Sequence, residues 1–557
     1  MSKLIIVSNR LPVTINRKEG ELFFHPSAGG LATGLHSYKS DLQRLWVGWV
    51  GAVVEKDWER VSIEKDLNKD GLVPIFLSQK DVELFYEGFS NKVIWPHFHY
   101  FTQYTTYHDA YWESYKEVNQ LFATAVSEYI EEGDILWIHD YQLLLLPALL
   151  RKLFPSISIG FFLHIPFPSY EIFRILPWRK EILDGVLGAD LIGFHTFGYM
   201  RHFLSATYRI TGYEHDFGKL SVEGRPVNVD VFPMGIDYQK YAKQEIVLSG
   251  KDHSFQIQRL AKKCSLVLSI DRLDYTKGIP QRIYAFEQFL IENPAYHGKV
   301  IFFLIVVPSR SNVDQYIELK EEVDTLVGRI NAQYGSFDWF PIRYYYRSLA
   351  FQEISTLYRE SQIALITPLR DGMNLVAKEF VASKDKSRKG VLILSEMAGA
   401  SNELSDALII NPHDQAGVVN ALKQALEMTA TEQSWRLRNM QKQLKKYDVR
   451  HWAESFIEEL TKKTLKKEVQ LNKDSVQELL KAYSSAKSRL IVLDYDGTLM
   501  DFHVDPQAVK PDAELLYSLK TLCTNDKNKV VINTGSCLLY TSPSPRDATL
   551  SRMPSSA

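Results

Sequence analysis

Two short segments combine charged side chains with glycine turns in a pattern suited to a diphosphate. The first, DRLDYTKG, follows an apolar run and places Arg272 and Lys277 around a turn that ends at Gly278. Two cations at the carboxyl end of a strand can stabilise charge that develops on a departing diphosphate. A solvated turn with a local Arg–Asp pair would contain the same residues, so this segment alone is a weak signal.

The second segment, TPLRDGMNLVAKE, also follows an apolar run and includes Asp371 and a tight turn at Gly372. A helix is expected to start near Asn374, and the free N–H groups of a helix start bind anions. Glu379 follows about a turn and a half later, where its carboxylate could accept hydrogen bonds from two ribose hydroxyls. The alternative is a plain strand–turn–helix with an asparagine cap and an exposed glutamate.

The N-terminal half adds residues that sugar phosphates use. Arg10 closes the first apolar run, and the glycine pair of SAGGL, which includes Gly30, permits close backbone approach to a phosphate. Flat aromatic faces follow at Trp46, Trp49, Tyr86 and Trp95. Core packing is the commoner role for each aromatic residue alone, and their clustering shifts that balance modestly.

Two further apolar runs end in polar residues, one at His139 and Asp140 and the other at His164. A lone histidine or aspartate in a core is usually structural. Here both runs end where strands of a parallel sheet should open onto a ligand cleft.

These residues require a scaffold of parallel strands. Short apolar runs followed by helical periodicity occur at Leu4–Val7, Ile135–Ile138, Ile157–Leu163, Leu191–Phe194, Leu266–Ile270, Ile301–Val307, Ile363–Thr367, Val391–Leu394 and Leu408–Ile410. Such alternation predicts an α/β protein whose parallel sheets are covered on both faces. Because there are too many units for one doubly wound sheet, we expect two Rossmann-like domains, with a break near Pro233–Asp237 and a ligand cleft between them.

Size and composition agree with a multidomain globular protein. The 557 residues allow two or three domains, and 65 basic against 67 acidic side chains give no electrostatic reason to expect nucleic acid or a membrane as partner. The three cysteines form no C-x-x-C pair, no signal peptide is recognisable, and no apolar run reaches the roughly 20 residues of a membrane span. We therefore expect a cytoplasmic protein.

The amino-acid composition changes after about residue 460. Residues 462–487 predict an exposed helix or linker, and a new strand then ends in D-x-D-G-T, with Asp494 placed as a nucleophile toward phosphorus and Asp496 as an acid/base. An ordinary Asp-Gly turn is the alternative. From residue 537 the chain is rich in Ser and Pro without periodicity, which is typical of disorder and is similar to translated sequencing adapter.

Taken in order, SNRLPV, SAGGLATGL, FSNKVIWPHFHY, WIHDYQLLLLP, FFLHIPFPSYEIFR, LSIDRLDYTKGIPQR, VVPSR and PLRDGMNLVAKEF resemble the trehalose-6-phosphate synthases over residues 3–460. The resemblance implies a GT-B fold of two facing Rossmann-like domains. It also implies retaining transfer of glucose from UDP-glucose to glucose 6-phosphate, which gives α,α-trehalose 6-phosphate and UDP without a metal or other cofactor. A homo-oligomer is compatible with it.

The resemblance also implies roles for single residues. The acceptor group consists of Arg10, Trp49, Tyr86, Trp95, Asp140 and Arg310. The donor group consists of Gly30, His164, Arg272, Lys277, Asp371, Gly372, Met373, Asn374, Leu375, Val376 and Glu379. Among these, Arg272, Lys277, Asp140 and His164 are the expected catalytic residues.

The last segment resembles trehalose-6-phosphate phosphatases of the haloacid-dehalogenase type. That resemblance implies Mg²⁺ at Asp494 and Asp496 and a phosphate-binding hydroxyl at Thr534, in a partial α/β domain. The downstream lysine, later acidic residues and cap of that family have no counterpart, so we expect no phosphatase activity from this chain.

The implied domains are an acceptor domain (1–235), a nucleotide-sugar domain (236–445), a helix that returns to the first domain (446–465), a linker (466–488), the phosphatase-type segment (489–536) and a disordered tail (537–557). Two alternatives remain open. One is a related transferase with another nucleotide sugar or acceptor phosphate, and the other is a non-catalytic regulator that binds sugar phosphates.

Overall fold

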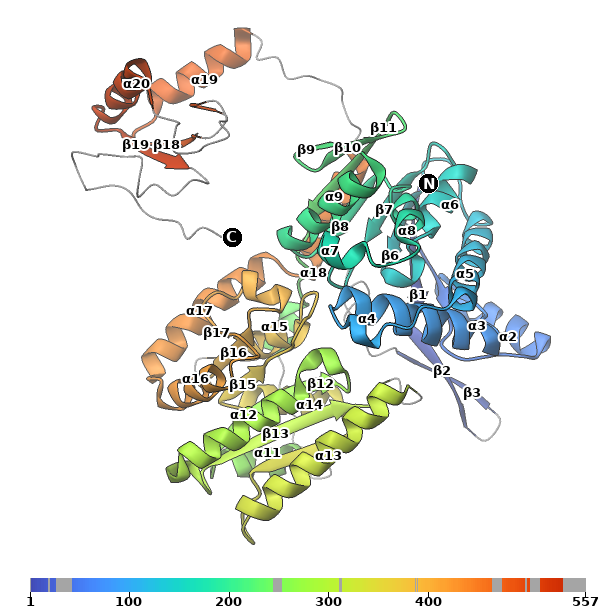
Figure 1. Ribbon diagram of the computed structural model, residues 1–557, viewed down its shortest axis with the longest axis vertical. Helices are drawn as coiled ribbons and strands as arrows, with labels where there is room; N and C mark the ends of the chain where they lie inside the picture. Colours follow the sequence, from blue (N-terminus) through green and yellow to red (C-terminus); the bar gives the residue numbers. More distant parts are fainter. Residues whose placement is uncertain are drawn as a thin grey trace. The chain divides into compact units, whose positions relative to one another are not determined.

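The computed structural model describes residues 2–18, 21–26, 43–243, 253–309, 313–385, 387, 389–462, 473–495, 498–500 and 511–533. The chain divides into two compact units, Met1–Lys462 and Lys463–Ala557. The first unit contains two large sheets with helices on their faces (Figure 1). The predicted α/β class with two parallel-sheet domains is thereby confirmed.

In the described part of the first unit, nine strands form the N-terminal sheet in the order β5-β4-β1-β6-β7-β8-β11-β10-β9. The strands are β1 (Lys3–Arg10), β4 (Gln43–Trp49), β5 (Leu72–Ile75), β6 (Ile135–His139), β7 (Ser158–Phe162), β8 (Leu191–Phe194), β9 (His215–Asp216), β10 (Lys219–Val222) and β11 (Arg225–Val231). Pairing is parallel from β5 to β11, and β10 and β9 extend that edge in antiparallel fashion. A separate antiparallel hairpin joins β2 (Val13–Lys18) to β3 (Glu21–Pro26).

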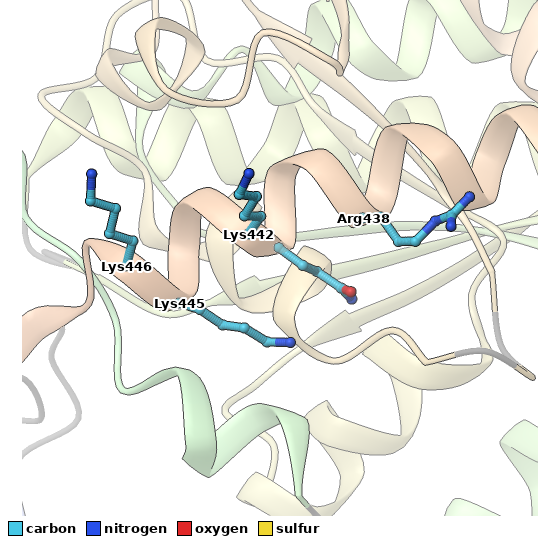
Figure 2. Close-up of a pocket in the computed structure, with 5 residues that line it drawn as sticks. Arg438, Lys442, Lys445 and Lys446 are labelled. Atoms are coloured by element: carbon cyan, nitrogen blue, oxygen red, sulfur yellow. The ribbon is translucent and has the colours of Figure 1, made fainter. Parts of the chain in front are cut away.

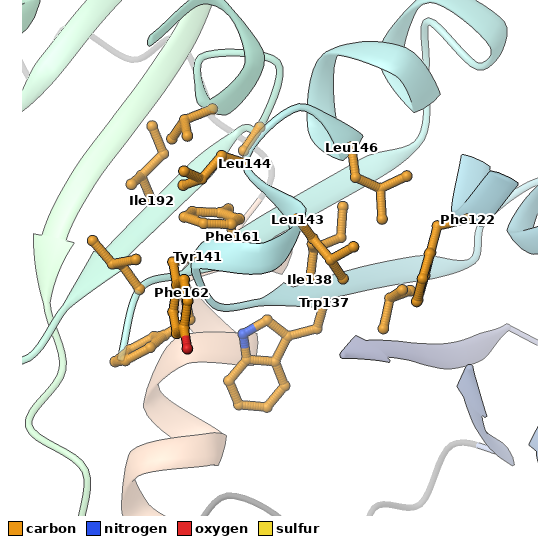
Figure 3. Packing of buried hydrophobic residues seen from close by; sticks show 14 of the residues in the cluster. Phe122, Trp137, Ile138, Tyr141, Leu143, Leu144, Leu146, Phe161, Phe162 and Ile192 are labelled. Atoms are coloured by element: carbon orange, nitrogen blue, oxygen red, sulfur yellow. The ribbon is translucent and has the colours of Figure 1, made fainter. Parts of the chain in front are cut away.

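Helices cover this sheet between its strands. They are α2 (Asp57–Asn68), α3 (Gln79–Asp81), the π-helix η1 (Val82–Ile94), α4 (Trp95–Phe98), η2 (Thr102–Tyr104), α5 (Asp109–Ser127), η3 (Tyr141–Leu143), α6 (Leu146–Leu153), α7 (Tyr170–Phe173), α8 (Arg179–Val186) and α9 (Phe197–Thr211). Figure 3 shows the core that they enclose, where Phe122, Trp137 and Phe161 are buried.

The second sheet is parallel throughout, with the order β14-β13-β12-β15-β16-β17. Its strands are β12 (Ser265–Arg272), β13 (Val300–Val307), β14 (Ile342–Tyr346), β15 (Ile363–Ile366), β16 (Val391–Ser395) and β17 (Leu408–Ile410). The helices around it are α10 (Tyr238–Ala242), α11 (Ser254–Ala261), η4 (Tyr275–Lys277), α12 (Ile279–Glu292), η5 (Pro294–Tyr296), α13 (Asp314–Tyr334), α14 (Phe351–Glu360), α15 (Leu375–Ala382), η6 (Gly399–Asn402), α16 (Gln415–Glu427) and α17 (Ala430–Lys446). Strand β13, VIFFLIVV, is apolar throughout because helices bury both faces of a parallel sheet.

The chain passes between the two domains twice. Met234 lies in the first hydrophobic core and Ile236 in the second. The return passage is pinned where the N–H of Val449 donates to the carbonyl of Ile236 at 3.1 Å. Helix α18 (Val449–Thr461) then packs on the first sheet, with the ring of Phe456 4.8 Å from that of Trp137.

This packing of α18 requires a glycine in the sheet. A Cβ at Gly160 of β7 would lie 2.6 Å from the Phe456 ring, closer than van der Waals contact allows. The terminal helix of the unit thus completes the core of the first sheet.

The described part of the second unit contains α19 (Lys473–Ser485), β18 (Arg489–Asp494), α20 (Ala513–Cys523) and β19 (Asn528–Asn533). Strands β18 and β19 pair in parallel, from Arg489 opposite Asn528 to Asp494 opposite Asn533. Asp494 therefore lies at the carboxyl end of its strand, as the sequence predicted.

Candidate active site

Arg10 and two aromatic rings form a cluster at the carboxyl ends of β1 and β4. Arg10 pairs with Trp49 in the strand register, and its guanidinium lies 4.7 Å from the Trp49 ring centre and 5.4 Å from that of Tyr86. The two rings meet edge to face at 5.5 Å. Arg10 is exposed and can bind an anion, and Tyr86 is partly exposed and can offer a ring face to a sugar, whereas Trp49 is 3% exposed and packs behind them.

Trp46, three residues earlier on β4, has the structural role that we weighed against sugar binding. Its side chain is 2% exposed, and its indole N–H donates to Ser8 Oγ at 2.8 Å inside the core.

Arg272 and Trp95 form a contact between the two domains. Arg272 is the last residue of β12 and is exposed, and its guanidinium lies 5.7 Å from the Trp95 ring centre. Trp95 also packs against Tyr141, which follows β6. A residue of the expected donor group thus contacts a residue of the expected acceptor group.

Asp140 has an unusual backbone. Its φ is +76°, a region that costs a non-glycine residue energy and often marks functional sites. Its Oδ1 accepts a hydrogen bond from the His164 N–H at 3.2 Å. Burial raises the pKa of Asp140 to about 7, although this hydrogen bond, that of the Tyr141 N–H and the charge of Arg272 all oppose the shift.

His164 contacts both domains. Its ring Nε2 lies 3.1 Å from Nδ1 of His139, and its carbonyl abuts Gly372 of the second domain. A Cβ at Gly372 would overlap that carbonyl oxygen, so the backbone approach depends on glycine. The hydroxyl of Tyr199 adds a second link between the domains by donating to the carbonyl of Asp371 at 3.1 Å.

Lys277 and Asp371, 94 residues apart, form an ion pair at 2.5 Å. Asn374 donates to the same carboxylate at 3.1 Å. Although burial opposes ionisation of Asp371, the charge of Lys277 and the two hydrogen bonds outweigh it and lower the pKa of the carboxyl group. The Asp371 carboxylate is therefore ionised and already accepts hydrogen bonds from Lys277 and Asn374. Lys277 in turn has one anionic partner, Asp371.

Helix α15 starts as predicted, with Asn374 as its cap. Asn374 has φ +75°, and its side chain accepts from the Ala377 N–H at 3.1 Å. The N–H groups of Leu375 and Val376 have no partner inside the helix, because the first turn has no preceding carbonyls. Met373, just before the cap, is buried.

Glu379 is held by two tyrosines. Tyr241 donates to its Oε1 at 2.9 Å and Tyr358 to its Oε2 at 2.7 Å. Burial raises the pKa of Glu379, and the two hydroxyls act against that shift. Each carboxylate oxygen keeps a further lone pair for a ligand hydroxyl.

A buried arginine that carried no motif supports the loop between Arg272 and Lys277. Arg282 on α12 is 1% exposed and donates to Asp271 Oδ2 at 2.7 Å, to Thr367 Oγ1 at 2.9 Å and to the Lys277 carbonyl at 2.9 Å. Sequence reasoning passed over Arg282, Tyr199, Tyr241 and Tyr358, because each acts across a long stretch of chain.

Four predicted residues, Gly30, Arg310, Asp496 and Thr534, lie outside the described residues. Asp494 is the described carboxylate of the predicted magnesium pair, and it lies 3.5 Å from both Thr498 Oγ1 and Asn533 Nδ2. Within the described ranges, no three His, Cys, Asp or Glu side chains are grouped to hold a metal ion. No described helix is long and apolar enough to cross a membrane.

A basic hollow on α17 is separate from these residues. Figure 2 shows Arg438, Lys442, Lys445 and Lys446 along the helix, and Gln441 completes the lining. None of the five contributes to the groups described above.

Residues 2–462 match the family model of glycosyltransferase family 20. The chain belongs to this family. Residues 492–541 match a second model, trehalose-phosphatase.

A bifunctional trehalose-6-phosphate synthase/phosphatase of Thermoproteus tenax is 44% identical over 550 residues, which cover 96% of this chain and 74% of that protein. Among solved structures, the E. coli trehalose-6-phosphate protein bound with UDP-2-fluoro glucose is 36% identical, with a TM-score of 0.74 over 82% of this chain and 99% of that one. A UDP-forming α,α-trehalose-phosphate synthase of Burkholderia xenovorans in complex with glucose-6-phosphate is 33% identical, with a TM-score of 0.74 over 82% of this chain and 100% of that one.

Proposed function

We infer that this chain is a UDP-forming α,α-trehalose-phosphate synthase that acts in trehalose biosynthesis. The observation that carries this conclusion is the contact of Arg272 with Trp95. It brings a cation at the end of the second sheet against an aromatic residue of the first domain, so that a sugar nucleotide and a sugar phosphate would meet.

We propose UDP-glucose as the donor and glucose 6-phosphate as the acceptor. The relatives bound with UDP-2-fluoro glucose and with glucose-6-phosphate support this pair of substrates. For the acceptor, exposed Arg10 supplies a charge for the phosphate and partly exposed Tyr86 supplies a face for the sugar, while buried Trp49 packs behind the Arg10 guanidinium.

For the donor, we propose that Arg272 and Lys277 bind the diphosphate and that the N–H groups from Met373 to Val376 help to hold it. Glu379, already oriented by Tyr241 and Tyr358, accepts from the ribose hydroxyls. Lys277 is already paired with Asp371. The donor diphosphate would therefore be the second anion to contact the Lys277 ammonium group.

We propose transfer with retention through a front-face ion pair. A retaining glycosidase mechanism uses two carboxyl groups about 5 Å apart, one of them a free nucleophile. Asp371 is the carboxylate that we expect beside the donor sugar, and it is instead bound by Lys277 and Asn374.

In the proposed step, the bond between the anomeric carbon and the UDP oxygen breaks, and the acceptor's anomeric hydroxyl forms the new bond on the same face. Its proton passes to the departing phosphate oxygen. Arg272 and Lys277 stabilise the charge of the leaving diphosphate, an effect worth roughly 10²–10³ in turnover.

Asp140 then has an orienting role toward the acceptor. Its strained φ fixes the carboxylate beside His164, and its ionised form accepts a hydrogen bond from an acceptor hydroxyl. We further propose that the transfer needs no metal, because two protein cations supply the positive charge at the diphosphate. Activity that survives a chelator supports this, and loss of activity restored by Mg²⁺ opposes it.

The proposal is tested by following UDP release from purified protein with UDP-glucose, with and without glucose 6-phosphate. Release that depends on glucose 6-phosphate supports the synthase. Release that needs another sugar phosphate, or ADP- or GDP-glucose, indicates the related transferase. Binding of both ligands without release indicates a regulator.

A further inference from the structure

Three histidines lie in a row at the carboxyl ends of β6, β7 and β8. His139 Nδ1 is 3.1 Å from His164 Nε2, and the ring centres of His164 and His195 are 5.4 Å apart. His139 is fully buried and His195 nearly so, whereas His164 is partly exposed. Only the middle ring therefore has access to a ligand in the cleft.

Burial keeps all three rings neutral. It lowers the pKa of His164 to about 3 and the pKa values of His139 and His195 well below the usual range. A neutral imidazole has one N–H and one bare nitrogen. In the contact between His139 and His164, one ring must donate and the other accept, so the direction of this bond determines both tautomers.

The surroundings of His139 decide that direction. Its other nitrogen, Nε2, is buried with no hydrogen-bond partner among the described residues. If His164 donated, Nε2 of His139 would carry a buried, unpaired N–H, the rarer kind of orphan in proteins. If His139 donates, Nε2 is a bare nitrogen.

The neighbouring rings favour the bare nitrogen as well. His139 packs 4.6 Å from Trp137 and 6.3 Å from Trp452, measured between ring centres. The indole N–H groups of both tryptophans are also buried without a partner in the described structure. An N–H on His139 Nε2 would add a third unpaired donor to this part of the core. A lone pair on the same nitrogen is electrostatically better suited to the dipoles of the two indole N–H groups. Figure 3 shows Trp137 beside the buried side chains of this core.

We propose that His139 is a positioning residue that sets the tautomer of His164. The Nδ1–H of His139 donates to Nε2 of His164, and the proton of the His164 ring consequently resides on its Nδ1. That atom is not among the buried atoms without a partner, so it is the nitrogen left for the cleft.

The consequence concerns substrate recognition and rests on the proposed function. A fixed N–H on His164 donates to an oxygen of the sugar beside it, whereas the opposite tautomer would offer a lone pair. The neutral ring neither switches to imidazolium nor serves as a general acid near neutral pH. His164 therefore orients the donor glucose, and His139 keeps its ring ready to do so.

The first test does not depend on activity. The intact chain, labelled with ¹⁵N-histidine, is studied by NMR, and the His164 signals are assigned by their loss in His164→Asn. We expect a pyrrole-type Nδ1 and a pyridine-type Nε2 at neutral pH. The reverse assignment would overturn the proposal and would indicate that the indole faces accept the buried N–H of His139.

The second test uses variants. His139→Leu removes the donor and is expected to lower kcat/KM for UDP-glucose by about tenfold to a hundredfold, as loss of a supporting hydrogen bond does in other sites. The KM for glucose 6-phosphate should change little. His139→Asn restores an N–H near the Nδ1 position and should recover most of the lost activity.

His97→Leu is the matched control. His97 is another fully buried histidine, and its ring bonds to the Ile172 carbonyl at 2.7 Å. Its loss should lower stability without changing the ¹⁵N pattern of His164. Equal loss in His139→Asn and His139→Leu, or an unchanged His164 pattern in His139→Leu, contradicts the positioning role. If the unaltered chain makes no disaccharide phosphate, the proposed function fails, whereas the NMR result still decides the tautomer.

Discussion

The contact of Gly372 with the His164 backbone makes a sharp prediction for Gly372→Ala. A Cβ at Gly372 would overlap the His164 carbonyl oxygen and would lie 3.1 Å from the carbonyl carbon and 3.2 Å from Ile165 Cα. These are backbone atoms that no rotamer change can move. The φ of Gly372 is not positive, so the effect is steric and not conformational.

The magnitude follows from this geometry. Relieving the overlap requires the turn or the two domains to move by about 1 Å, and such a displacement at reacting groups costs roughly 10²-fold in rate. Overpacking of this kind costs about 1–3 kcal/mol where the structure cannot yield. Because the clash lies where the two domains meet, they can separate slightly, and we expect the activity loss to exceed the stability loss.

Gly328→Ala is the matched control. Gly328 lies on an exposed position of α13, and a Cβ there meets nothing within 4 Å. Alanine in a helix should add about 0.5–1 kcal/mol to the free energy of unfolding. Both variants are assayed by kcat/KM for UDP release and by thermal unfolding. Near-normal kcat/KM in Gly372→Ala would show that this backbone contact is absent from the productive complex and would refute the reasoning.

Three further predictions concern the charges of the site. Arg272→Ala and Lys277→Ala should each lower kcat by roughly 10²–10³-fold with an unchanged far-UV spectrum, and near-normal turnover in both would remove the proposed leaving-group stabilisation. Because burial raises the pKa of Asp140 to about 7, its carboxyl group is neutral below that pH and ionised above it, so kcat/KM for glucose 6-phosphate should fall as pH decreases through about 7. Asp140→Asn should remove this dependence, and an identical pH profile in that variant would assign the titration to another group. Tyr358→Phe removes a donor from Glu379, whose pKa should then rise further, and KM for UDP-glucose should increase by about fivefold to tenfold; an unchanged KM would separate Glu379 from ribose binding.

Much of the fold was predictable because buried parallel strands are apolar on both faces. All nine predicted runs occur in strands, from β1 to β17. Strands with mixed composition were missed: β4 (QRLWVGW) mixes polar, aromatic and glycine residues, and β14 (IRYYY) has a single buried residue at its start. Periodicity carries no signal where a strand lies at an edge or alternates large and small residues.

The candidate site was predictable where a motif is local. Asn374 caps α15 and Arg272 ends β12 because a strand, a turn and a helix start follow one another within a few residues. The pairing of Lys277 with Asp371 joins two such motifs, and only the strand order of the second sheet brings them together. The partners of Glu379, from α10 and α14, depend on helix packing and have no local signature.

The most direct measurement of the central claim is the structure of the product. Purified protein is incubated with UDP-glucose and glucose 6-phosphate, and the sugar product is analysed by NMR while UDP is quantified. We predict one equivalent of an α,α-linked disaccharide 6-phosphate for each UDP released. UDP release with free glucose as the only sugar product, or a β-linked disaccharide, would contradict the account.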